Sequence, residues 1–145
     1  MGGYFVDTNV LVFSRIPTMP LHAAAKDAVD AIFQSGADLW ISRQIIREFL
    51  ATLTRLQKFT LPLPIAQVTG EILHLERAAI VADETAAVTQ RLLALLAAIP
   101  CGGKQVHDAN IVATMLVHGV PSLLTHNVAD FKRFSHLITV IPLVP

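Results

Sequence analysis

Four carboxylic acids stand where the sequence predicts that separate chain elements begin, end or expose an edge. Asp7 closes a short apolar run, and Glu48 lies within a helical pattern. Asp108 opens another helical pattern, and Asp130 follows a further apolar run. Carboxylate oxygens are hard ligands that suit Mg²⁺ or Mn²⁺, and such ions support displacement at phosphorus. The four acids therefore predict a metal-dependent phosphoryl-transfer site.

Each acid taken alone also has an ordinary structural explanation. Asp7 could form an Asx-turn as the chain leaves a strand, and the helix dipole favours an acid at the position of Asp108. Asn127 and Asp130 have the spacing of a capping box. Glu48 sits beside an apolar helix face, where a side chain reaching back to water is as good an explanation as a metal ligand. These separate explanations leave the joint pattern unexplained.

A cluster of uncompensated acids repels itself and raises its own pKa values, and a divalent cation relieves that repulsion. Neighbouring polar side chains would then orient the carboxylates, water or phosphate through hydrogen bonds. The candidates for this supporting role are Thr8, Asn9, Thr125 and Asn127.

The elements that must position these residues alternate between strands and helices. Strands are expected at 4–7, 39–41, 80–82, 122–125 and 138–141. Helices are expected at 21–34, from a cap at Ser42 onward, and at 65–78, 85–99, 106–118 and 128–134, with Asn9 capping a further helical turn. Such alternation predicts an α/β layer fold with a parallel sheet, in which ligands bind beyond the carboxyl ends of the strands. With no repeat or linker visible, residues 1–145 are expected to form one domain.

The composition points to association with another protein. Hydrophobic residues make up 53% of the chain and charged residues only 15%, against roughly 25% charged in typical soluble chains. A homodimer or a protein partner is the expected consequence. The chain has eleven basic and eleven acidic residues, so its net charge gives no indication of nucleic-acid binding. RNA contacts would then depend on local cations such as Arg43 and Arg47, although a solvated helix face explains that pair equally simply.

Cys101 is the only cysteine, which excludes an internal disulfide framework and is typical of a reducing compartment. No signal segment or membrane span is expected from the sequence, so a cytoplasmic protein is predicted. Nucleophilic catalysis by Cys101 is not indicated, because no base accompanies it. His107 and His126 adjoin the proposed site and could touch phosphate or act as acids. Adjacent helical residues point apart, so His107 is expected to face elsewhere than Asp108.

The chain resembles the PIN-domain family, and within it the VapC-type toxins of bacterial toxin–antitoxin pairs. The resemblance spans nearly the whole chain and rests on an ordered set of motifs. They are Val-Asp-Thr-Asn-Val-Leu at 6–11, Arg-Glu-Phe at 47–49, Val-His-Asp-Ala at 106–109 and Thr-His-Asn-Val-Ala-Asp-Phe at 125–131.

The resemblance implies a three-layer α/β/α fold around a central, mostly parallel sheet, and Mg²⁺- or Mn²⁺-dependent endoribonuclease activity. It also implies a homodimer and neutralisation by a cognate antitoxin protein. By matching motif positions, the acidic quartet consists of Asp7, Glu48, Asp108 and Asp130, and the polar supports include Asn9, Thr125 and Asn127.

Two other classes of function compete with this reading. A non-catalytic RNA- or protein-binding module of the same fold would bind its partner without turnover that EDTA abolishes. A phosphatase using an aspartyl-phosphate is disfavoured, because no second acid stands two residues after Asp7.

Overall fold

A parallel sheet forms the centre of the molecule. The computed structural model describes residues 2–58 and 60–145. Within these ranges the strands form one five-stranded sheet in the order β3-β2-β1-β4-β5, and every neighbouring pair is parallel. The strands are β1 (Tyr4–Val6), β2 (Leu39–Ser42), β3 (Ile80–Ala82), β4 (Ser122–Thr125) and β5 (Thr139–Pro142). Because β1 and β4 are neighbours, the residues that follow them, Asp7 and His126, leave the sheet side by side.

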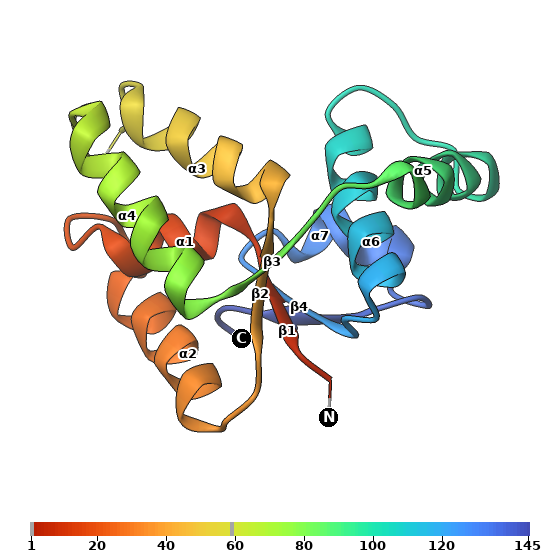
Figure 1. Cartoon of the computed structure of the whole chain (residues 1–145), viewed down its shortest axis with the longest axis horizontal. Helices are drawn as coiled ribbons and strands as arrows, with labels where there is room; N and C mark the ends of the chain where they lie inside the picture. The colour runs from red at the N-terminus through yellow and green to blue at the C-terminus, as the bar shows by residue number, and fades with distance from the viewer. Residues whose placement is uncertain (1, 59) are drawn as a thin grey trace.

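Helices cover both faces of this sheet. They are α1 (Thr8–Arg15), α2 (His22–Gln34), α3 (Arg43–Thr54), α4 (Ile65–Ala78), α5 (Ala86–Ala98), α6 (Gln105–His118), α7 (Val128–Phe131) and the 3₁₀ turn η1 (Lys132–Phe134). Figure 1 shows α1 to α4 on one side of the sheet and α5 to α7 on the other. The predicted three-layer α/β/α architecture is confirmed.

The strands are apolar because both faces of the sheet are covered, as in other parallel sheets. Phe5, Ile41 and Leu123, from three neighbouring strands, are fully buried. Phe49 of α3 is fully buried as well, so α3 is held on the core by its apolar face. In the described ranges, no helix has both the length and the apolar character that crossing a bilayer requires.

Most predicted elements coincide with the observed ones, including the helix at 65–78 and the strands at 80–82 and 122–125. Ser42 caps α3 as expected, accepting a hydrogen bond from the Ile45 N–H at 3.3 Å. The expected helix at 21–34 begins one residue later, because Leu21 has a left-handed backbone with φ of 63°. The expected helix at 128–134 divides into α7 and η1.

Candidate active site

Asp7 lies at the carboxyl end of β1 and is almost fully buried. Its carboxylate accepts hydrogen bonds from the Thr8 N–H at 2.8 Å, Asn9 Nδ2 at 3.3 Å and Thr125 Oγ1 at 2.8 Å. Asp7 is also the N-cap of α1. The prediction that Asn9 caps this helix is therefore wrong. Asn9 lies inside the first turn, and its Oδ1 accepts a hydrogen bond from the His126 N–H at 3.1 Å.

Glu48 reaches the same place from α3, and Thr8 connects it to Asp7. The Thr8 hydroxyl donates to Glu48 Oε1 at 3.3 Å, while the backbone N–H of Thr8 donates to Asp7. Gln44, one turn earlier on α3, donates from Nε2 to Glu48 Oε1 at 3.4 Å. Glu48 is only partly buried.

Asp108 and Asp130 come from the first turns of α6 and α7. Asp108 is partly buried, whereas Asp130 is exposed. The capping-box explanation for Asn127 and Asp130 does not hold, because Asn127 makes no side-chain capping hydrogen bond. Its backbone N–H instead donates to Thr125 Oγ1 at 3.0 Å.

The four acids act on one another electrostatically. Burial raises the pKa of Asp108 to about 6, and the charges of Asp130, Asp7 and Glu48 add to the effect, while Arg133 opposes it. Burial likewise raises the pKa of Glu48, with repulsion from Asp7 as the next cause. The pKa of Asp7 is raised by burial despite its three hydrogen-bond donors, and Asp130 adds to the rise. Such mutual repulsion means that the acids from four different elements share one neighbourhood.

Three of these acids line a cleft of about 450 Å³. Its walls include Asp7, Glu48 and Asp108, with Thr8, Asn9 and Asn127 beside them. Asp130 lies outside the lining and contributes through its charge. The cleft opens at the carboxyl ends of β1 and β4, where a parallel sheet is expected to bind ligands.

The donor chemistry of this cleft fits a hard divalent cation. In the described part of the chain, no three His, Cys, Asp or Glu side chains stand close enough to hold an ion together as they are. Mg²⁺ commonly uses only one or two carboxylates and keeps several of its waters, so a complete protein cage is not required. Carboxylates that repel one another, as Asp108 does its three neighbours, are the groups that a cation would stabilise.

Thr125 supports Asp7 from β4. It is fully buried, and its hydroxyl donates to Asp7 while accepting from the Asn127 N–H. Thr125→Val keeps the shape and removes this hydroxyl. We expect divalent-cation affinity to fall roughly 10- to 100-fold and the free energy of unfolding to fall by about 1–3 kcal/mol. Mn²⁺ titration calorimetry and urea unfolding measure the two effects. Thr125→Ser should stay close to wild type, and equal Mn²⁺ affinity in Thr125→Val and wild type would disprove the supporting role.

A partly buried polar network beside Glu48 joins α3 to α6 and was not predicted from the sequence. Asn110 Nδ2 donates to Gln44 Oε1 at 2.8 Å and to Glu84 Oε1 at 2.9 Å. Gln44 donates from its backbone N–H to Glu84 Oε2 at 2.6 Å and from Nε2 to the His107 carbonyl at 3.0 Å. The sequence did carry one signal, since Glu84 follows the end of β3 as Asp7 follows β1.

Removing the side-chain amide of Gln44 tests this network. Gln44 is 6% exposed. Gln44→Leu removes the side-chain donor to the His107 carbonyl and one side-chain acceptor of the Asn110 amide. We expect a loss of about 1–3 kcal/mol in the free energy of unfolding, measured by urea denaturation. Gln67→Leu, at an exposed position of α4, is the control. A stability equal to that of the control would mean that the network contributes nothing to the fold.

The two arginines predicted to contact RNA lie outside the cleft lining. Arg43 pairs with Asp83 at 3.1 Å, and Arg47 lies 3.9 Å from Glu84. Arg55, at the end of α3, is the arginine among the cleft-lining residues. RNA contacts by Arg43 and Arg47 remain a prediction. Arg55, unlike these two, lines the cleft itself.

Neither histidine lines the cleft. His107 is exposed, and its charge favours the ionised form of Glu48, lowering the pKa of that carboxyl against the larger effect of burial. The ring of His126 meets Phe13 edge-to-face, with ring centroids 5.6 Å apart.

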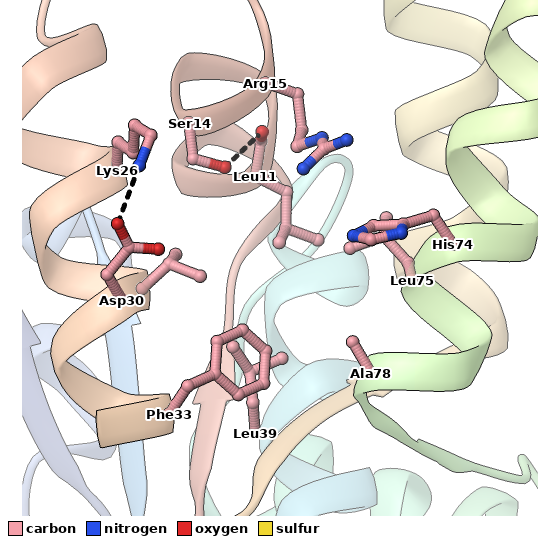
Figure 2. A pocket seen from close by; sticks show the side chains of 11 residues that line it. Leu11, Ser14, Arg15, Lys26, Asp30, Phe33, Leu39, His74, Leu75 and Ala78 are labelled. Atoms are coloured by element: carbon pink, nitrogen blue, oxygen red, sulfur yellow. Dashed lines mark hydrogen bonds and ion pairs between the residues drawn. The ribbon is translucent and has the colours of Figure 1, made fainter. Parts of the chain in front are cut away.

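A second pocket, of about 440 Å³, lies between α1, α2 and α4 and has a different character (Figure 2). Leu11, Leu75 and Phe33 contribute apolar walls. Its charged groups are already paired within the chain: Lys26 contacts Asp30 at 2.7 Å, and Arg15 contacts Glu71. This pocket offers no cluster of free carboxylates, so the chemistry of the acids belongs to the cleft at the sheet edge.

Solved structures of bacterial toxin–antitoxin proteins are similar in fold to this chain. VapBC2 from Rickettsia felis, bound to a DNA fragment of its promoter, has a TM-score of 0.71 at 17% identity, covering 96% of this chain and 97% of that one. VapC20 from Mycobacterium tuberculosis, described as a toxin that cleaves the sarcin–ricin loop, has a TM-score of 0.68 at 18% identity, covering 97% and 99%. A toxin–antitoxin complex from Klebsiella pneumoniae has a TM-score of 0.68 at 21% identity, covering 97% and 98%. At these identities the likeness establishes the fold.

The family of this chain is shown by its match to a protein-family model. The PIN-domain model matches residues 4–137, so this chain belongs to the PIN-domain family. No curated protein shows significant similarity to it.

Proposed function

We propose that this PIN-domain protein is a Mg²⁺- or Mn²⁺-dependent endoribonuclease and the toxin of a VapBC-like toxin–antitoxin pair. One observation carries the proposal: Asp7, Glu48 and Asp108, from the end of β1, from α3 and from α6, line one cleft. Burial, together with repulsion from the other acids, raises the pKa of Asp108 to about 6. Acids with raised pKa values cluster at functional sites. Here a bound cation and an anionic substrate would interact with them.

The bound ion would supply Lewis-acid activation of water and of a phosphate oxygen. The chain's own residues would orient the components. Asp7 is held rigid by its three donors, and the Thr8 hydroxyl fixes Glu48 relative to Asp7. Asp108 lines the same cleft from α6. Glu48 and Asp108 are open enough to meet ion-bound water and RNA, and no side chain needs to form a covalent intermediate.

RNA is the proposed substrate, and a cognate antitoxin and a second copy of the chain are the proposed partners. The VapC20 description as a loop-cleaving toxin and the complexes among the structural neighbours support this assignment. Large apolar side chains that remain exposed, including Leu56, Leu61 and Leu93 at 73%, 74% and 61%, also support a protein partner. We place the protein in the cytoplasm, where its RNA substrate would be.

The decisive experiment incubates purified protein with total RNA and Mg²⁺, with and without EDTA, and maps the cut ends. Metal-dependent cleavage at defined positions is expected, with EDTA removing it. RNA binding without EDTA-sensitive turnover would instead favour the binding module of PIN fold. Co-expression with the product of an adjacent small reading frame tests the toxin role, because relief of growth arrest is expected.

A further inference from the structure

The cleft continues from the acids along one face of α3. Glu48, Ala51, Thr52 and Arg55 all line it, at relative positions 0, 3, 4 and 7 on the helix. Residues with this spacing share a helical face. Seven residues of helix span about 10 Å, so Arg55 lies roughly that far along the cleft from Glu48.

In the part of the chain that the structure describes, Arg55 differs from the neighbouring arginines of α3 in having no ion-pair partner. Arg43 and Arg47 are paired with Asp83 and Glu84 outside the cleft. Within residues 2–58 and 60–145, Arg55 forms no ion pair or side-chain hydrogen bond, and it is exposed. It is therefore an available guanidinium in a cleft whose other end is anionic.

The surroundings of Arg55 suit a nucleotide. Phe13 and Met19 contribute partly buried apolar surface to the cleft, and Gln57 lines it beside Arg55. The Gln57 amide donates to the Thr52 carbonyl at 2.5 Å, which holds the segment after α3 against the helix. Aromatic and apolar side chains provide surfaces for bases in single-stranded RNA.

We propose that Arg55 binds a phosphate of the same RNA strand within about three nucleotides of the one that is cut, so that the strand runs along α3 from the acids to Arg55. This inference rests on the proposed ribonuclease function. An RNA strand that approaches three carboxylates is repelled unless a cation lies along its path, and a guanidinium binds phosphate through two parallel hydrogen bonds. The separation of about 10 Å equals roughly three stacked nucleotides at ~3.4 Å each, and fewer in an extended strand. Arg55 then positions the strand and takes no part in the chemical step.

The test compares Arg55→Ala with Arg91→Ala, an exposed arginine of α5 outside the cleft. Cleavage of a short single-stranded RNA that carries a mapped cut site is followed as salt increases. Arg55→Ala is expected to raise KM about tenfold with kcat changed less than about twofold. The slope of log(kcat/KM) against log[salt] should become shallower by about 0.7, the value for one lost phosphate contact on a single strand. Arg55→Lys should restore the slope, and Arg91→Ala should match wild type.

A loss confined to kcat, or an unchanged KM and salt slope in Arg55→Ala, would overturn the proposal. Anisotropy of a labelled RNA in EDTA measures binding separately from turnover. Arg55→Ala should weaken that binding about tenfold, and equal binding by mutant and wild type would again count against Arg55. If wild type binds RNA through Arg55 but never cuts it, the ribonuclease function fails while the RNA path along α3 stands.

Discussion

Asp108→Asn is expected to lower kcat/KM for metal-dependent RNA cleavage by more than roughly 100-fold, the upper range for losing a residue that only supports a metal ligand. Asp108 faces the cleft together with Asp7 and Glu48. Asn keeps the size of the side chain but removes the charge that would hold the cation. The fold should remain intact, because the substitution also removes an acid that three neighbours repel.

Asp27→Asn, on the exposed face of α2, is the matched control and should cut RNA like wild type. Circular dichroism and the thermal midpoint of Asp108→Asn establish that the protein is folded before activity is compared. Asp7→Asn should show a similar loss, although Asp7 also caps α1, so its stability needs the same check. Full activity in folded Asp108→Asn would refute the assignment of this acid.

The second large effect is a pH-dependent stabilisation by divalent cations. Burial and the neighbouring acids raise the pKa of Asp108 from its ordinary value of 3.8 to about 6. Between these two pH values the folded protein therefore holds a proton that the unfolded chain has released. This carboxyl therefore lowers the stability of the metal-free protein progressively as pH rises from about 4 to about 6. A cation competes with that proton, so metal affinity should increase over the same window.

Thermal unfolding of wild type and Asp108→Asn at pH 5 and pH 7.5 measures both effects. Without metal, the midpoint of Asp108→Asn should rise relative to wild type on going from pH 5 to pH 7.5, because other titrating groups are common to both proteins. Millimolar Mg²⁺ should raise the wild-type midpoint more at pH 7.5 than at pH 5, and should raise that of Asp108→Asn much less. A cation effect that is independent of pH and identical in the two proteins would contradict the proposed metal role.

The fold could be predicted from the sequence because hydrophobic periodicity and the residues at element ends indicate where the strands and helices lie. The alternation of apolar runs with amphipathic segments located the strands and helices, and the parallel sheet followed from that alternation. The remaining errors are local. Asn9 was preferred as a cap by residue type, whereas the Asp7 carboxylate, fixed between β1 and β4, was already placed to accept the first N–H of α1.

Long-range contacts explain what the sequence did not reveal about the site. Asp7 and Thr125 are 118 residues apart and meet because β1 and β4 are neighbours in the sheet. The strand order cannot be read from either residue by itself. The network of Gln44, Asn110 and Glu84 depends on how α3 packs near α6 and the end of β3, so spacing along one helix could not predict it. The difference between Arg43 and Arg55 likewise depends on the position of Asp83 in space.

The most direct test of the central claim is a crystal of this protein grown with Mn²⁺ and measured for anomalous scattering. A Mn²⁺ peak touching the carboxylates of Asp7 and Asp108, with Glu48 in contact directly or through water, is the predicted result. No peak in this cleft at saturating Mn²⁺, or occupancy only at other sites, would contradict the account.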